Sequence, residues 1–198
     1  DELAHHAGAD PVAYRLKLLT DKPRHAATLA LAAHKAGWGS PLAPGRGRGV
    51  ALVDCFKTIV CHVAEVTVGS DGSVKVDRIV SAVDAGMPVN PDGLRAQIEG
   101  AILFGLSAAL SGEITIEKGA VVQANFPDYP VARLADCPDI AINFLGDDAP
   151  LGGGGEPGVP PVAPAIANAI FAATGTRIRD LPLRNRFAAL TRRPSASL

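Results

Sequence analysis

The chain has 198 residues, of which 47% are apolar and 20% are charged, and its formal net charge is -1. A balance so close to neutral gives no broad electrostatic attraction for nucleic acid or an anionic membrane. The mean hydropathy is +0.19, yet no run approaches the roughly 18 apolar residues of a membrane span. The composition predicts a tightly packed domain, part of whose surface is normally covered by further polypeptide.

The amino-terminal part of the chain has the pattern of short helices. Breaks at Gly8–Pro11 and at Asp21–Pro23 separate the helical stretches. A loop rich in glycine and proline, "GSPLAPGRGRG", then ends this region. We expect 1–45 to form a helical segment and 46–198 a carboxy-terminal subdomain.

Three basic residues lie in or before that loop. Arg46 and Arg48, with Lys35 upstream, could contact an anionic cofactor. A solvated loop is the more common outcome for such residues, and both alternatives stay open at this point.

From Gly49 onward, β-branched residues and partial alternation indicate strands. The stretch 49–69 is expected to be extended and to turn at Ser70–Gly72 into a second strand. Another hairpin is expected at Glu117–Gly119, and "DIAINFLG" predicts one more strand. Because helices and mostly antiparallel strands come in blocks, the expected class is α+β, with helices packed on a mostly antiparallel sheet.

The stretch 90–112 has the start and stop signals of a helix. Asn90 suits the N-cap, Pro91 the first helical position and Gly112 the end. Two internal glycines, Gly100 and Gly105, would each weaken an isolated helix by about 1 kcal/mol relative to alanine. Their presence predicts the close approach of another backbone or of a cofactor.

The stretch "GGGGEPG" at 152–158 allows three interpretations. A nucleotide-phosphate loop is disfavoured, because the lysine and Ser/Thr of a P-loop are missing and prolines stand where N–H donors are needed. A purely structural loop is the second interpretation. In the third, the glycines leave room for a bulky ligand and Glu156 is a base directed at it. Pro157 restrains the backbone of Glu156, and the apolar helix that follows provides a low-dielectric setting.

The histidines and cysteines give no metal-ligand pattern. His62 lies in an apolar run and is expected to be a core histidine. The cysteines Cys55, Cys61 and Cys137 are odd in number and lack a C-x-x-C spacing, which argues against a zinc ribbon or an iron–sulfur cluster in this chain. We expect all three to be small buried side chains.

Four stretches together resemble a known family. The stretch "GGGGEPGVPPVAPAIANAIFAATGTRIRDLPL" is similar to the carboxy-terminal segment of the molybdenum-binding subunit of the xanthine oxidase family of molybdenum hydroxylases. Within that family, the stretch resembles the beta subunits of isoquinoline 1-oxidoreductase and related bacterial aldehyde dehydrogenases. The other three stretches that match are "DELAHHAGADPVAYRLKLL", "AVDAGMPVNPDGLRAQIEGAILFGLSAAL" and "GEITIEKGAVVQANFPDYPVAR".

The resemblance implies a site and a cofactor. It identifies Glu156 as the active-site base, and Gln97 and Gly155 as residues that hold molybdopterin, in its plain or its cytosine dinucleotide form. The implied reaction oxidises an aldehyde or an N-heteroaromatic substrate with water as the oxygen source. The chain itself would supply no metal ligand, and iron–sulfur clusters would lie only on a partner subunit.

The chain is short for a whole subunit of this family. The resemblance therefore implies a carboxy-terminal portion, either a split subunit or an excised fragment, that is inactive without the amino-terminal part. A non-catalytic module of the same fold and a nucleotide-dependent oxidoreductase are the alternatives. Periplasm and cytoplasm both remain open as compartments.

Overall fold

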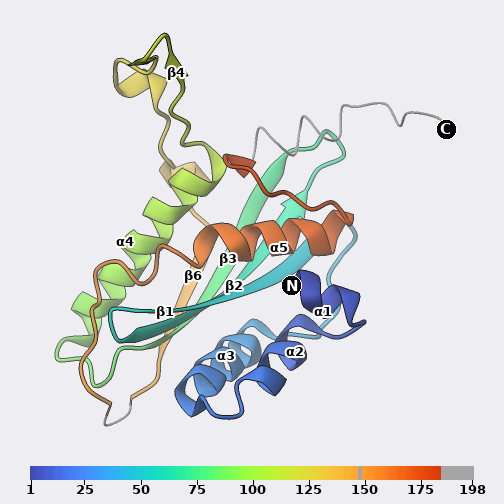
Figure 1. Cartoon of the computed structure of the whole chain (residues 1–198), viewed down its shortest axis with the longest axis vertical. Helices are drawn as coiled ribbons and strands as arrows, with labels where there is room; N and C mark the ends of the chain where they lie inside the picture. Colours follow the sequence, from blue (N-terminus) through green and yellow to red (C-terminus); the bar gives the residue numbers. More distant parts are fainter. Residues whose placement is uncertain (147–148, 184–198) are drawn as a thin grey trace.

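The computed structural model describes residues 1–146 and 149–183, which form a sheet with helices on both faces (Figure 1). The strands stand in the order β1-β2-β3-β6, where β1, β2 and β3 are antiparallel and β6 runs parallel to β3. The predicted α+β class with a mostly antiparallel sheet is confirmed. The strands are β1 (Arg46–Cys55), β2 (Thr58–Val68), β3 (Val74–Asp84) and β6 (Asp139–Phe144).

Helices cover both faces of this sheet. On one face α3 packs against β2 and β3, and on the other α5 packs against β1 and β2 with α4 beside it. The division into a helical segment, 1–45, and a subdomain, 46–198, stays a prediction, and part of the second lies outside the described residues. The helices are α1 (Glu2–His6), α2 (Pro11–Leu18), α3 (Pro23–Ala36), α4 (Pro91–Leu110) and α5 (Val162–Thr174).

The central strand β2 is buried on both faces, which explains its nearly continuous apolar sequence. Val60 and Ala64 belong to the core beneath α4 and α5, whereas Cys61 and Val63 belong to the core beneath α3. His62 therefore projects towards the α4 and α5 face, because alternate residues of a strand share a face.

Glycines of β1 allow α5 to lie directly on the sheet. A Cβ atom at Gly49 would overlap the backbone of Ala165 and Ala169, and one at Gly47 would lie 2.6 Å from the nitrogen of Ala173. The stretch "GRGRG", expected to end a loop, is consequently the start of a strand. Its glycines provide the close helix contact.

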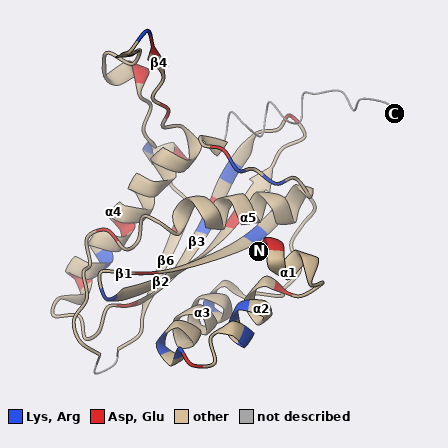
Figure 2. Cartoon of the chain, viewed as in Figure 1, with Lys and Arg blue, Asp and Glu red and all other residues tan. Residues whose placement is uncertain are grey.

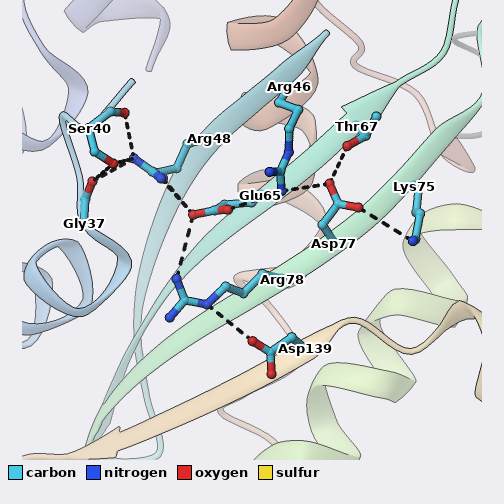
Figure 3. Close-up of polar contacts among 10 residues, drawn as sticks. All are labelled: Gly37, Ser40, Arg46, Arg48, Glu65, Thr67, Lys75, Asp77, Arg78 and Asp139. Atoms are coloured by element: carbon cyan, nitrogen blue, oxygen red, sulfur yellow. Dashed lines mark hydrogen bonds and ion pairs between the residues drawn. The ribbon is translucent and has the colours of Figure 1, made fainter. Parts of the chain in front are cut away.

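The arginines of that stretch are held by carboxylates on the sheet (Figure 3). Arg48 Nη2 lies 2.8 Å from Glu65 Oε1, and Arg46 Nη2 lies 3.3 Å from Asp77 Oδ2. Arg48 pairs across the sheet with Glu65, far along β1 from its turn into β2. The two arginines thus form a structural network on the sheet, and the expected solvated loop is wrong for them.

The sequence did not predict the turn between β1 and β2. Its central residues, Phe56 and Lys57, have φ values of 53° and 65°, which non-glycine residues seldom adopt. The stretch 49–69, expected as one strand, is therefore two. Sequence signals for such a turn are Asn-Gly or Asp-Gly, and neither occurs here.

Residues 113–136 form an arm that projects from the end of α4 away from the sheet (Figure 1). The hairpin of β4 (Ile116–Glu117) and β5 (Ala120–Val121) lies at its tip. The hairpin predicted at Glu117–Gly119 is confirmed, with Glu117 as the last residue of β4 and Lys118 and Gly119 in the turn. Apolar side chains along this arm are exposed; they are Ile114, Ile116, Val121, Val122, Phe126, Tyr129, Val131 and Leu134.

Acidic and basic side chains are interspersed over the described elements, as the near-neutral net charge predicts (Figure 2). Among the helices described, none is both long enough and apolar enough to cross a membrane.

Gly49→Ala should destabilise the fold by about 1–3 kcal/mol, because a Cβ atom there is forced against the backbone of α5. Urea denaturation of both chains measures this loss. Gly146→Ala is the matched control, since its Cβ would meet nothing within 4 Å, and it should stay within about 0.5 kcal/mol of the parent chain. Equal effects of the two substitutions would contradict the packing argument.

Candidate functional site

The site begins at the first turns of α4. The side chain of Asn90 accepts a hydrogen bond of 2.9 Å from the Gly93 N–H, and Pro91 occupies the first helical position, as predicted. Of the two internal glycines, only Gly105 has the close contact with other polypeptide that was expected. Gly105 packs against Val162 of α5, while a Cβ at Gly100 would meet nothing within 4 Å.

The glutamate loop, residues 150–158, is tied to the sheet by hydrogen bonds of its backbone. Gly152 N–H donates to Ala85 O at 3.0 Å, and Gly153 N–H donates to Phe56 O at 2.8 Å. The hydroxyl of Thr58 donates to Gly153 O at 2.7 Å. The loop is thereby fixed on the end of β3 and on the β1–β2 turn, which it passes in Figure 1.

The end of β3 is itself anchored by an ion pair between a buried carboxylate and a partly exposed arginine. Asp84 is fully buried and accepts two hydrogen bonds of 2.8 Å from Arg24 of α3. Such a two-pronged arginine–carboxylate contact is geometrically specific. It holds the strand end that leads directly to Ala85 and to the glutamate loop.

Three of the four consecutive glycines make room for the protein rather than for a ligand. A Cβ at Gly152 would lie 2.7 Å from Lys57 O, one at Gly153 would lie 2.9 Å from Phe56 Cβ, and one at Gly154 would lie 2.7 Å from Leu94 Cδ1. Only Gly155 has space, its nearest neighbour being Gln97 Oε1 at 3.9 Å. The expectation that the whole run clears space is therefore wrong for Gly152, Gly153 and Gly154, and Gly155 alone leaves space that a ligand could occupy.

His62 holds the far end of the loop. Its Nε2 lies 2.8 Å from Gly158 O; since a carbonyl can only accept, Nε2 carries the hydrogen. The side chain is fully buried, and burial lowers its pKa to about 4 although backbone hydrogen bonds favour the charged form. His62 is thus the expected neutral core histidine, and it also fixes Gly158, two residues beyond Glu156.

Gly158 brings the loop against α4. A Cβ there would lie 2.9 Å from Ala101 Cβ and 3.5 Å from Ile98 O. Residues on this stretch of α4 include Gln97 and Gly100, which face the loop. The same close contact therefore sets how far Glu156 stands from Gln97.

Glu156 and Gln97 line one cavity of about 380 Å³. Both side chains are exposed to it, and Gly155 and Gly100 contribute walls without side chains. The remaining lining residues are mostly apolar: Ala96, Ala101, Phe104 and Val159. All three predicted site residues, Glu156, Gln97 and Gly155, thus meet at one place.

A second cavity, of about 320 Å³, adjoins the same loop. Phe56, Gly153 and Pro157 line it, and it shares only Gly155 and Glu156 with the first. Glu156 therefore lines two spaces, one bounded by α4 and one by the β1–β2 turn.

Cys55 lies within electrostatic reach of this carboxylate. Burial raises the pKa of the Cys55 thiol, and the negative charges of Asp54 and Glu156 raise it further. Of the three cysteines, Cys61 alone is buried as expected, with a pKa raised to about 12 by burial, whereas Cys55 and Cys137 are half-buried. The expectation of three buried cysteines is wrong for these two.

The residues of the first cavity fit a bulky organic cofactor better than a bare metal ion. A side-chain amide can donate and accept hydrogen bonds to a heterocycle, and the glycine walls allow close approach of a ring. Within residues 1–146 and 149–183, no group of three His, Cys, Asp or Glu side chains could hold a metal ion.

Comparison with known proteins places the chain in a family of cofactor-binding domains. A family model described as the molybdopterin cofactor-binding domain matches residues 23–138. The isoquinoline 1-oxidoreductase subunit beta of Brevundimonas diminuta is 35% identical over 196 residues, which cover 97% of this chain and 25% of that protein. The aldehyde oxidoreductase molybdenum-binding subunit PaoC of Escherichia coli is 38% identical over 135 residues, covering 64% and 18%.

A solved structure agrees with these relatives. The crystal structure of quinoline 2-oxidoreductase from Pseudomonas putida 86 aligns with a TM-score of 0.63 and 25% identity, over 69% of this chain and 19% of that one. The chain therefore spans about a quarter or less of the length of these relatives.

Sequence reasoning missed two elements of the site. Phe56 carries no turn signal, and its place beside Glu156 depends on contacts between residues almost a hundred positions apart. The anchoring role of His62 had a weak signal, a single polar residue in an apolar strand.

The stability of the fold should depend on pH through His62. The folded pKa is about 4 and the ordinary value is 6.5, so the unfolded chain binds a proton more readily between these values. Stability contributed by neutral His62 is complete above pH 6.5 and is lost as the pH falls towards 4. Urea denaturation should show a free energy of unfolding about 2 kcal/mol smaller at pH 5 than at pH 7 from this group alone.

His62→Gln isolates this contribution, because glutamine keeps an N–H donor and does not titrate. The difference in stability between the parent chain and His62→Gln should shrink from pH 7 to pH 5. A constant difference would show that His62 is not held neutral.

Proposed function

Because the chain belongs to the molybdopterin cofactor-binding domain family of molybdenum hydroxylases, we propose that it is the carboxy-terminal part of such an enzyme. The enzyme would oxidise an aldehyde or an N-heteroaromatic compound, with water as the oxygen source. Relatives named for isoquinoline, quinoline and aldehyde oxidation support this substrate range. The observation that carries the proposal is the cavity shared by Glu156 and Gln97.

Gln97 and Gly155 are the residues that would hold the cofactor. Gln97 presents a side-chain amide from an exposed turn of α4. Gly155 lines the same cavity and has no side chain to fill it. The bound molybdenum cofactor would supply the redox chemistry, taking two electrons from the substrate. The cofactor could be the plain or the cytosine dinucleotide form.

Glu156 would act as the base. Its carboxylate is exposed in both cavities, so it can accept a proton from a group bound on either side. Backbone hydrogen bonds at Gly152 and Gly153 and the His62 contact at Gly158 hold the loop on either side of it. A general base requires such a fixed placement, because it must first lie within hydrogen-bond reach of the proton that it accepts.

Further polypeptide would complete the enzyme. The chain spans about a quarter of the isoquinoline relative, and the apolar arm 113–136 is exposed. We propose that the amino-terminal part of the molybdenum subunit covers such surfaces and that the chain is inactive without it. Electrons would leave through iron–sulfur clusters on a partner subunit.

Glu156→Gln should reduce kcat by about 10²–10⁴-fold, because the amide cannot accept the proton. Molybdenum content should stay unchanged, since the loop and Gln97 are untouched. Dye reduction with an aldehyde substrate and metal analysis of the complete enzyme measure both. Glu117→Gln, which removes an exposed charge on the arm, is the control. Near-normal turnover in Glu156→Gln would refute the role as base.

Gln97→Ala should instead lower cofactor retention. Loss of one hydrogen bond of about 1 kcal/mol predicts a roughly fivefold weaker hold on the cofactor. Molybdenum occupancy after gel filtration of the complete enzyme is the measurement. Glu99→Ala is the control, since Glu99 is on the same helix but outside the cavity lining. Unchanged occupancy in Gln97→Ala would contradict the assignment.

If the complete enzyme holds no molybdenum and reduces no dye with any aldehyde, the chain is a non-catalytic module of the same fold. The nucleotide-dependent alternative has lost its main support, because three of the four glycines pack against protein. A rise in Tm on adding adenosine phosphates would restore it.

A further inference from the structure

Two basic side chains stand at the start of α3, where helix stability disfavours them. Arg24 and His25 follow Pro23 in the first turn, which contains no acidic residue. The amino end of a helix carries a partial positive charge, so basic side chains are unfavourable there. The position of these two residues is therefore explained by contacts outside the helix.

Each of the two side chains binds a carboxylate on a different strand. Arg24 donates two hydrogen bonds of 2.8 Å to Asp84 at the end of β3. His25 Nε2 lies 3.0 Å from Asp54 Oδ2 near the end of β1, and it carries the hydrogen because a carboxylate can only accept. Two consecutive residues of one helix thus hold β1 and β3 at once.

The two carboxylates belong to one row across the sheet. Asp54 pairs with Ile59 in the register of β1 and β2, and Ile59 pairs with Asp84 in the register of β2 and β3. Val50 and Ala82 lie in the core beneath α3, each an even number of positions before a carboxylate, so this row faces α3. The two contacts therefore tie β1 and β3 together across β2 at one level of the sheet.

The glutamate loop docks directly beside this row. Ala85 follows the carboxylate residue of β3, and its carbonyl accepts the 3.0 Å hydrogen bond from Gly152. Phe56 stands two residues after the carboxylate residue of β1, and its carbonyl accepts the 2.8 Å hydrogen bond from Gly153. Each of these two carbonyls is thus within two residues of a side chain held by α3.

The two contacts differ in strength. Burial raises the pKa of Asp84, but hydrogen bonds from Arg24 and from the Gly86 N–H outweigh it, and the pKa lies below its ordinary value. Removing Arg24 outright would leave a buried charge without this partner, at a cost to the whole fold. His25 and Asp54 are both partly exposed, so their contact can be removed while the fold is kept.

We propose that Arg24 and His25 are positioning residues for Glu156. Through the two carboxylates they hold the strand ends on which the glutamate loop docks, and they thereby fix the place of the base beside Gln97. Neither residue lines either cavity, so both act on the base only through the loop. This inference rests on the proposed function, in which Glu156 is the base.

His25→Ala in the complete enzyme is the first test. Loss of one hydrogen bond should lower kcat per bound molybdenum about three- to tenfold, and KM should stay unchanged because the lining of the cavities is untouched. Hydrogen exchange in peptides that cover the glutamate loop, followed by mass spectrometry, should become faster. His25→Gln should restore both kcat and slow exchange, since glutamine keeps an N–H donor for Asp54.

Arg24→Lys tests the stronger contact. Lysine keeps the positive charge against buried Asp84 but loses the two-pronged geometry. We expect kcat per bound molybdenum to fall about ten- to a hundredfold, because a small misplacement of a reacting group has effects of this size. Exchange at Gly152 and Gly153 should again become faster.

Asp139→Asn is the matched control. It removes the carboxylate from another partly exposed ion pair of β3, that with Arg78, which lies away from the strand end (Figure 3). Any fall in Tm that it causes should leave loop exchange and kcat per bound molybdenum unchanged. Equal effects of Asp139→Asn and His25→Ala on the loop would overturn the proposal, as would faster loop exchange without a fall in kcat.

Turnover of Glu156→Gln separates this proposal from the proposed function, because hydrogen exchange reports the loop whatever the role of its carboxylate. If Glu156→Gln keeps full turnover while His25→Ala and Arg24→Lys speed loop exchange and lower kcat, the base is misassigned and the positioning contacts stand. If Glu156→Gln is inactive while the other two variants change neither exchange nor kcat, the positioning role is wrong and the base stands.

Discussion

The docking of the glutamate loop on the β1–β2 turn is the contact on which the rest of the site depends. Hydrogen bonds at Gly152 and Gly153 and the absence of side chains there bring two backbones together. A hydrogen bond from His62 of the central strand β2 holds the same loop at Gly158. Because interiors are close-packed, a small change at any of these points would displace Glu156 from Gln97.

The loop therefore has two parts with different tasks. Residues 152–154 pack against other parts of the protein. Residues 155–156 line the cavity instead. Neutral His62 suits this arrangement, since a buried charge beside the loop would be costly without a partner. Rigidity behind the carboxylate and openness in front of it are what a positioned base needs.

Capping and turn residues correctly predicted the elements that depend on interactions between residues close in sequence. Asn90 and Pro91 mark the start of α4, and Lys118–Gly119 makes the hairpin turn of the arm. The resemblance brought Glu156, Gln97 and Gly155 together before any coordinates did. The strand at 46–49 and the turn at Phe56–Lys57 were missed because contacts distant in sequence, with α5 and with the glutamate loop, override local preference.

The sequence distance across the site has a consequence for biogenesis. Thr58 and Gly153 are 95 positions apart, and His62 and Gly158 are 96 apart. Loop closure over such spans is slow and comes late in folding. During synthesis, Glu156 can reach its position in the fold only after the sheet, α4 and the arm have left the ribosome. A cofactor held beside Glu156 would therefore enter its site only after this region has been translated.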